Sequence, residues 1–215
     1  MAVRLIDLSH TIENGQPGFP GDPAAELSLW ATVDQQGYHI SRLCLSTHHG
    51  THVDLPYHVV PGGITAATAP VQWFCGPARL VDLAPSSALP AGTAISVAML
   101  EVHERGFEPG GRVLVRTGWD RRFGSPEYYR DYPRFTEEAA QWLVSRRIRL
   151  LGMDTPSPEA DTNRIHRLLL ESDIVLIENL CRLEELPEEF ILCALPLKLS
   201  GGDGSPVRAV ALVPA

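Results

Sequence analysis

Long hydrophobic runs, basic clusters and a secretory leader are all missing from this chain of 215 residues. No apolar stretch approaches the roughly 18 residues that a membrane-spanning helix needs, so the sequence argues against a membrane protein. The formal net charge of −8 argues against a nucleic-acid partner, because phosphate binding needs a basic surface. The N-terminus lacks the basic start and apolar core of a secretory signal, and we therefore expect a cytoplasmic protein.

Cysteine and lysine are also scarce. The four cysteines, at positions 44, 75, 181 and 193, form no Cys-x-x-Cys pair, and three of them lie in apolar runs. This pattern favours reduced, buried thiols over a disulfide framework or a thiolate metal site. Lys198 is the only lysine in the chain, and no function follows from its position.

The remaining composition, 44% hydrophobic and 20% charged, is typical of a soluble globular domain. Strands are predicted at 4–8, 27–33, 39–47, 78–83, 112–117, 150–153, 174–178, 190–195 and 207–213, and helices at 96–104, 136–147 and 158–170. We expect the second and third strands to be half-buried and joined by a hairpin turn. Because strands and helices do not alternate regularly, we predict one α/β domain over residues 1–215 with a mixed sheet, not a doubly wound sheet or an eightfold barrel.

The most informative stretch is 46–60, which carries four groups able to bind a metal or move a proton: His48, His52, Asp54 and His58. A helix would place two of them opposite the other two, whereas an extended segment points all four the same way. The intervening glycine, threonine, valine and proline are poor helix formers. We therefore predict a strand running into a loop, with all four groups facing one cavity.

Imidazole with carboxylate is a ligand mixture preferred by zinc and its neighbours in the first transition series. His58 is free in this scheme to act as an acid or base, because its ordinary pKa lies near neutrality. A single histidine is more often merely hydrogen-bonded or exposed, but a cluster of ionisable groups usually marks a site. His49 falls on the other face of the strand and is expected in packing or solvent.

Further ligands must come from elsewhere in the chain. Glu178 interrupts a strongly apolar predicted strand, and a carboxylate there is costly to bury unless it finds a cation or a partner. His166 lies on a predicted helix. The simpler alternatives are a strand end that reaches solvent for Glu178 and an exposed helix histidine for His166.

The segment from His48 to His58 resembles the His-x-Gly-Thr-His-x-Asp-x-Pro-x-His pattern of the cyclase family of metal-dependent hydrolases, which includes the bacterial kynurenine formamidases. Nearly the whole chain shares this resemblance, since further similar segments lie at 20–22, 76–83, 116–119, 152–157 and 194–209. It implies an α/β fold of the swivelling β/β/α type, with a mixed sheet or partial barrel flanked by helices. It also implies a homodimer or a higher homo-oligomer.

The resemblance implies two zinc ions per subunit, with manganese as the alternative metal. The implied ligands are His48, His52 and Asp54 for one ion, and Asp54, His166 and Glu178 for the other. His58 would be the proton donor and acceptor. The implied reaction is hydrolysis of N-formylkynurenine or a similar aryl formamide, by a metal-activated water, to formate and the free amine.

One position departs from the formamidase pattern. Phe19 stands just before Pro-Gly-Asp, where formamidases generally carry a tryptophan against the aromatic ring of the substrate, and phenylalanine offers less area and no indole N–H. Two alternatives therefore stay open. A related enzyme would open a cyclic amide such as isatin, although such members place an amide side chain where Glu178 stands. A non-catalytic metal-binding protein would not need His58 beside a full ligand set.

Overall fold

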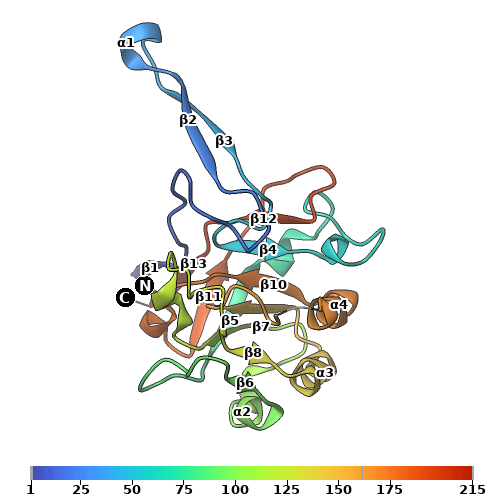
Figure 1. Cartoon of the computed structure of the whole chain (residues 1–215). Coiled ribbons are helices and arrows are strands. Elements are labelled where there is room, and N and C mark those ends of the chain that lie inside the picture. The colour runs from blue at the N-terminus through green and yellow to red at the C-terminus, as the bar shows by residue number, and fades with distance from the viewer. Residues whose placement is uncertain (1, 161, 215) are drawn as a thin grey trace.

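The computed structural model describes residues 2–160 and 162–214, and its centre is a curled mixed sheet of nine strands (Figure 1). In spatial order the strands are β1 (Val3–Asp7), β13 (Val210–Pro214), β11 (Glu189–Cys193), β5 (Cys75–Asp82), β7 (Arg112–Arg116), β9 (Leu150–Met153), β10 (Val175–Glu178), β4 (His52–Asp54) and β12 (Gly204–Pro206). The chain termini lie together at one end of this sheet (Figure 1).

The middle of the sheet is parallel and its two wings are antiparallel. Strands β5, β7, β9 and β10 pair in parallel, while the outer strands pair antiparallel on both sides. Strands β7, β9 and β10 are short and rich in valine, leucine and isoleucine. Both β9 and β10 are buried along their whole length, as parallel strands covered on both faces require. The predicted mixed sheet is therefore confirmed.

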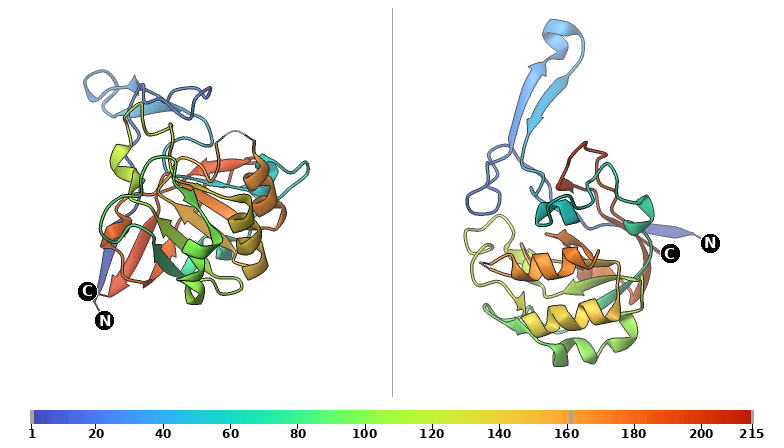
Figure 2. Two further views of the ribbon diagram at one scale, coloured as in Figure 1. Left: turned by 60° about the horizontal axis from the view of Figure 1, so that its bottom comes forward. Right: turned by 90° about the vertical axis from the view of Figure 1, so that its right-hand side faces the viewer.

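Three helices cover one face of the sheet: α2 (Val97–Glu101), α3 (Glu137–Arg146) and α4 (Arg164–Glu171) (Figures 1 and 2). Leu143 and Leu169 from these helices pack with Val113 and Leu151 of the sheet in one apolar core. A second core lies on the opposite face of the sheet and contains Leu114. The site described below is built where β4 and β10 meet α4.

Helix α3 begins where the sequence predicts it. The Thr136 side chain accepts a hydrogen bond from the backbone N–H of Ala139 (3.1 Å), and two glutamates occupy the first turn. Helix α4 is different, because it begins only at Arg164, so the predicted start at residue 158 is wrong. The Glu159 carboxylate accepts the N–H groups of Arg164 (2.9 Å) and His166 (2.8 Å), and the acid before the helix therefore caps it from outside.

A two-stranded hairpin projects from the body of the molecule (Figures 1 and 2). It consists of β2 (Glu26–Ala31) and β3 (Ile40–Cys44), with the one-turn helix α1 (Val33–Gln36) at its tip. The strands are confirmed, but the expectation that they are half-buried is wrong. Ala31 is the one buried residue of the two strands. A separate small sheet pairs β6 (Ala94–Ile95) with β8 (Arg134–Phe135).

The cysteines are more exposed than their sequence neighbours suggest. Cys181 is buried, whereas Cys44 and Cys75 are exposed and Cys193 is half-buried, so the expectation of buried thiols holds only for Cys181. Apolar neighbours in the sequence indicate that one face of a strand is covered. They do not predict whether a given cysteine side chain is buried. Over residues 2–160 and 162–214, no helix is both long and apolar enough to cross a membrane.

Candidate metal centre

Five separate segments bring the predicted site residues together. His52 and Asp54 lie on β4, and His58 ends a short 3₁₀ turn (Pro56–His58) that follows it. His48 comes from the turn before β4, His166 from α4 and Glu178 from β10. All six line one pocket of about 470 Å³, which Phe19 also lines.

Strand pairing explains how Glu178 reaches the early histidines. Strand β10 is the antiparallel neighbour of β4, and Glu178 stands directly opposite His52 in the ladder. Only residues 52–54 of the predicted strand are extended, so the expected single strand carrying all four groups is wrong in detail. Gly50, at φ +63°, turns the chain so that His48 lies back over β4, a backbone conformation that glycine adopts without a steric cost.

Asp54 lies at the centre of the cluster. Its Oδ1 is 2.7 Å from His48 Nδ1 and 3.2 Å from His52 Nε2, and its Oδ2 is 3.6 Å from His166 Nε2. Glu178 also contacts His52 and His166, with Oε2 3.4 Å from His52 Nε2 and Oε1 3.2 Å from His166 Nε2. Both carboxylates are buried. Asp54 therefore lies among three imidazoles and Glu178 between two, so Asp54 is the carboxylate placed to be shared by two cation sites.

His52 shows that this cluster fits a metal. Its Nδ1 donates to the carbonyl oxygen of Gly50 (2.9 Å), which leaves the neutral ring with an unprotonated Nε2. That Nε2 is buried and makes no hydrogen bond to the described residues, although it points at Asp54 and Glu178. Asn179 supports the arrangement by donating to the same carbonyl oxygen (2.8 Å). A buried nitrogen oriented in this way is typical of a metal-binding histidine.

His166 is oriented by an acid that the sequence did not single out. Its Nδ1 lies 3.0 Å from Glu159 Oε1, so its Nε2 faces Asp54 and Glu178. Burial raises the pKa of Glu159, but hydrogen bonds from His166 and the backbone outweigh it and lower the pKa to about 2. Glu159 lies in the stretch predicted as a helix, and nothing in its sequence neighbours indicates a contact with His166.

Asp203 plays the corresponding part for His48. Its Oδ2 lies 2.9 Å from His48 Nε2 and 3.4 Å from His58 Nδ1, and its Oδ1 accepts a hydrogen bond from Thr47 (2.8 Å). The hydrogen bonds with His48 and Thr47 lower the pKa of Asp203. Asp203 lies in the Gly-Gly-Asp-Gly segment, far along the chain from both histidines. Its role could not be read from spacing.

The two central carboxyls respond differently to the same surroundings. Burial raises the pKa of Glu178, and the nearby charge of Asp54 raises it further. Burial also opposes ionisation of Asp54, but His48 and His52 outweigh it and hold the pKa of Asp54 well below its ordinary value. Two buried acids this close repel each other unless positive charge lies between them.

The imidazoles supply that charge when they are protonated. Burial disfavours the charged forms of His48 and His166, but neighbouring carboxylates outweigh it and raise the pKa of each to about 10. For His58, burial is the largest influence and lowers the pKa. Since metals bind deprotonated ligands, a divalent cation would replace the protons on His48 and His166.

Within residues 2–160 and 162–214, three overlapping groups of side chains have ligand atoms close enough to hold one ion each. The groups are His48 with His52 and Asp54, Asp54 with His58 and His166, and His48 with His58 and Asp203. The first is the set predicted for one ion. The second contains part of the set predicted for the other ion, with His58 beside it. His58 is therefore within ligand distance of Asp54 and His166 and also lines the pocket.

An aromatic pair borders the pocket. Phe19 and Tyr129 are half-buried, and their rings meet edge to face with centroids 5.8 Å apart. Burial raises the pKa of Tyr129 to about 12, so its phenol stays neutral at ordinary pH. His49 is buried beside the site and does not line the pocket. Lys198 is exposed and does not line it either.

Comparison with known proteins agrees with this fold and identifies the family. The model of the cyclase family, described as "Putative cyclase", matches residues 6–160. Kynurenine formamidase from Bordetella avium is 35% identical over 211 residues, which cover 96% of this chain and 97% of that protein. Kynurenine formamidase from Bacillus anthracis is 30% identical, with 96% of each chain covered.

A solved structure extends the similarity to three dimensions. Isatin hydrolase A from Labrenzia aggregata, bound to benzyl benzoate, superposes with a TM-score of 0.88 at 26% identity, over 98% of this chain and 94% of that one. The resemblance noted in the sequence is thus confirmed by a family model, by full-length relatives and by a solved fold. This chain belongs to the cyclase family.

Proposed function

We propose that this protein is a metal-dependent amide hydrolase that cleaves an aryl formamide, such as N-formylkynurenine, to formate and the free amine. The observation that carries the proposal is the convergence of His52, Asp54, His166 and Glu178 on one buried cluster beside His58. The kynurenine formamidases that match nearly the whole chain support the substrate class. A cytoplasmic location and a part in tryptophan catabolism belong to the same proposal.

Five side chains are the proposed metal ligands. One ion would be held by His48, His52 and Asp54, and a second by Asp54, His166 and Glu178. Zinc is the proposed metal, with manganese as the alternative, because both accept imidazole and carboxylate ligands. Divalent ions held there would supply a water with a pKa lowered from about 16 to about 7, and positive charge for the carbonyl oxygen. Glu159 and Asp203 keep the ring nitrogens of His166 and His48 in the binding orientation.

His58 is the proposed proton carrier. Its side chain lines the pocket and is 28% exposed, and Asp203 lies 3.4 Å from its Nδ1. In the reaction His58 accepts a proton from the attacking water and returns it to the departing nitrogen of the amine. The amine nitrogen must gain a proton to leave, because an amide anion is a poor leaving group.

Phe19 and Tyr129 are the proposed walls for the aryl ring of the substrate. Aromatic rings prefer edge-to-face or offset-stacked neighbours, so an aryl ring packs favourably against either of these two side chains. The structural similarity to isatin hydrolase favours one second candidate, the opening of a cyclic amide in the same pocket. Both candidates use the same metal cluster and differ in the shape of the substrate.

A substrate panel separates these candidates. We expect N-formylkynurenine and simple aryl formamides to be hydrolysed with a higher kcat/KM than isatin or an aliphatic formamide. Phe19→Ala should raise KM for the aryl formamide by roughly 2- to 10-fold, because an aromatic contact contributes about 0.5–1.5 kcal/mol. The aliphatic formamide is the control and should show no such change. Faster turnover of isatin than of every formamide would favour the second candidate, and no turnover of any amide by the metal-loaded protein would favour a binding protein.

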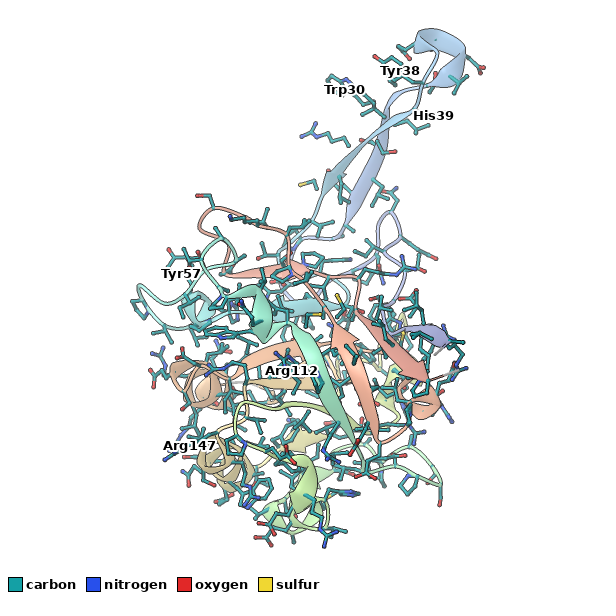
Figure 3. All side chains as sticks on the ribbon, turned by 180° about the vertical axis from the view of Figure 1, so that it is seen from behind. Trp30, Tyr38, His39, Tyr57, Arg112 and Arg147 are labelled. Carbon is teal, nitrogen blue, oxygen red and sulfur yellow. The ribbon has the colours of Figure 1, made fainter. Side chains whose placement is uncertain are left out.

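We also propose that the protein forms a homodimer or a higher homo-oligomer through the projecting hairpin. Its side chains include Leu29, Trp30, Tyr38 and Leu43, all more than half exposed, and Figure 3 shows Trp30 and Tyr38 on the arm away from the body. An isolated two-stranded ribbon is only marginally stable in water, and exposed apolar patches mark interaction sites. A second copy of the chain would cover this arm.

Trp30→Asp tests the oligomer. Trp30 is 72% exposed, and the loss of one buried tryptophan anchor at an interface costs at least about 2 kcal/mol, which is roughly 30-fold in the dissociation constant. Sedimentation velocity over a concentration series should show the wild type as a dimer or larger and the variant shifted toward monomer. Val102→Asp, at an exposed position outside the hairpin, is the control. A monomeric wild type, or a variant with unchanged assembly, would contradict the proposal.

A further inference from the structure

Two cysteines that are far apart in the sequence face each other in the sheet. Cys75 is the first residue of β5 and Cys193 the last residue of β11, and they are direct partners in this antiparallel pair. The other two cysteines have no such neighbour. Cys44 stands opposite Glu26 in the hairpin, and Cys181 lies outside the strands. The register of the sheet therefore creates a single facing pair of thiols among the described residues.

The backbone hydrogen bonds show which kind of pair this is. The N–H of Ala194 donates to the carbonyl oxygen of Phe74 (2.9 Å), so these adjacent residues form a hydrogen-bonded pair. Hydrogen-bonded and non-hydrogen-bonded pairs alternate along an antiparallel ladder, which makes Cys75 and Cys193 a non-hydrogen-bonded pair. Such pairs have the closer backbones, with Cα atoms about 4.5 Å apart. A disulfide needs a Cα separation of about 4.4–6.8 Å, so the backbone is already within range.

The surroundings of the two thiols differ. Cys75 is exposed and open to reagents, whereas Cys193 is half-buried. Burial raises the pKa of Cys193, and the neighbouring Cys75 side chain raises it further, as expected for side chains that share one face of a directly opposed strand pair. An exposed thiol with a second thiol directly opposite it is the arrangement in which one cysteine reacts first and the other resolves the product.

We propose that Cys75 and Cys193 are a reversible modification site that forms an intramolecular disulfide on exposure to a low-molecular-weight disulfide such as glutathione disulfide. The Cys75 thiolate attacks one sulfur of the reagent, forms a mixed disulfide and releases one thiol. Cys193 then gives up its proton and attacks the Cys75 sulfur, which breaks the mixed disulfide and releases the second thiol. Two protein thiols are oxidised, the reagent disulfide is reduced to two thiols, and the protons end on the released thiols.

The cysteine pair lies close in sequence to a residue of the candidate metal centre. After Cys193 the chain runs through residues 194–202 to Asp203, which contacts His48 and His58. The pair thus lies at the base of the segment that carries Asp203. It is nevertheless outside the pocket, so its oxidation is measured independently of turnover and of the proposed function.

The test uses the full-length native protein equilibrated with glutathione disulfide. Remaining thiols are blocked by alkylation, the protein is digested without reduction, and the peptides are identified by mass spectrometry. We expect one linked peptide pair joining Cys75 to Cys193, lost on reduction with dithiothreitol. Cys193→Ser should instead trap a stable glutathione adduct on Cys75. Cys44→Ser is the control and should give the same linked pair as the wild type, because Cys44 lies on the hairpin.

Three results would overturn the proposal, and each is read on the wild type, so none depends on the folding of a variant. The first is a lasting glutathione adduct on Cys75 without a linked pair. The second is two unmodified thiols after equilibration. The third is a mixture in which Cys44 or Cys181 is linked as often as Cys75 and Cys193, which would indicate unfolding and not a preformed pair.

Discussion

His58→Ala is expected to lower kcat by about 10²–10⁴-fold while leaving the metal content unchanged. The physical reason is that His58, in the proposed mechanism, moves the proton between water and the departing nitrogen. Turnover is measured on an aryl formamide, and metal content by elemental analysis of the same sample. Exogenous imidazole should restore part of the activity, since it replaces the missing ring.

The control for this variant is His39→Ala, which removes an exposed imidazole on the projecting hairpin (Figure 3). It should change neither turnover nor metal content. The alternative outcome is informative because His58 also lies within ligand distance of Asp54 and His166. If His58→Ala loses metal in proportion to activity, His58 is a ligand and not the proton carrier.

Asp54→Asn is expected to have the largest effect on metal binding. Asp54 contacts three imidazoles and is the one acid shared by both proposed ion sites, so its loss weakens both at once. We expect a loss of most bound metal and a fall in turnover to the detection limit. Elemental analysis and isothermal titration with zinc measure the change. Asp34→Asn, at the exposed tip of the hairpin, is the matched control.

Removing metal from the wild type tests the same point without a mutation. A chelator should abolish turnover and lower the melting temperature, because bound ions stabilise only the folded state and their loss leaves the buried Asp54 and Glu178 facing each other. Added zinc should restore both. Full activity in protein shown by elemental analysis to be free of metal would contradict the metal-dependent mechanism.

Local sequence information was enough for several elements. Strand β9 lies where the apolar run Leu150–Met153 predicts it, and α3 begins after its Thr136 cap, because periodicity and capping depend on neighbouring residues. Glu178 was predicted by an energetic argument, since a buried acid in an apolar strand requires a partner. The structure supplies those partners in His52 and His166.

The local sequence did not predict the features that depend on contacts between distant segments. Alternation in β2 and β3 predicts one apolar face but cannot say whether anything covers it, and within this chain nothing described covers the hairpin. Helix α4 begins at Arg164 and not at the predicted residue 158, because Glu159 lies before the helix, caps it and contacts His166. The hydrophobic periodicity of the sequence does not predict such a side-chain contact.

The sequence by itself determined the α/β class, the family, and the types and order of the candidate ligands from His48 to His58. Only the tertiary structure decided that Glu159 and Asp203 orient the histidines, and that Cys75 meets Cys193. The reason is that side-chain chemistry and short spacings are local properties of the chain. Which residues stand opposite each other depends on sheet register and helix packing, and these are set by contacts between segments far apart in the sequence.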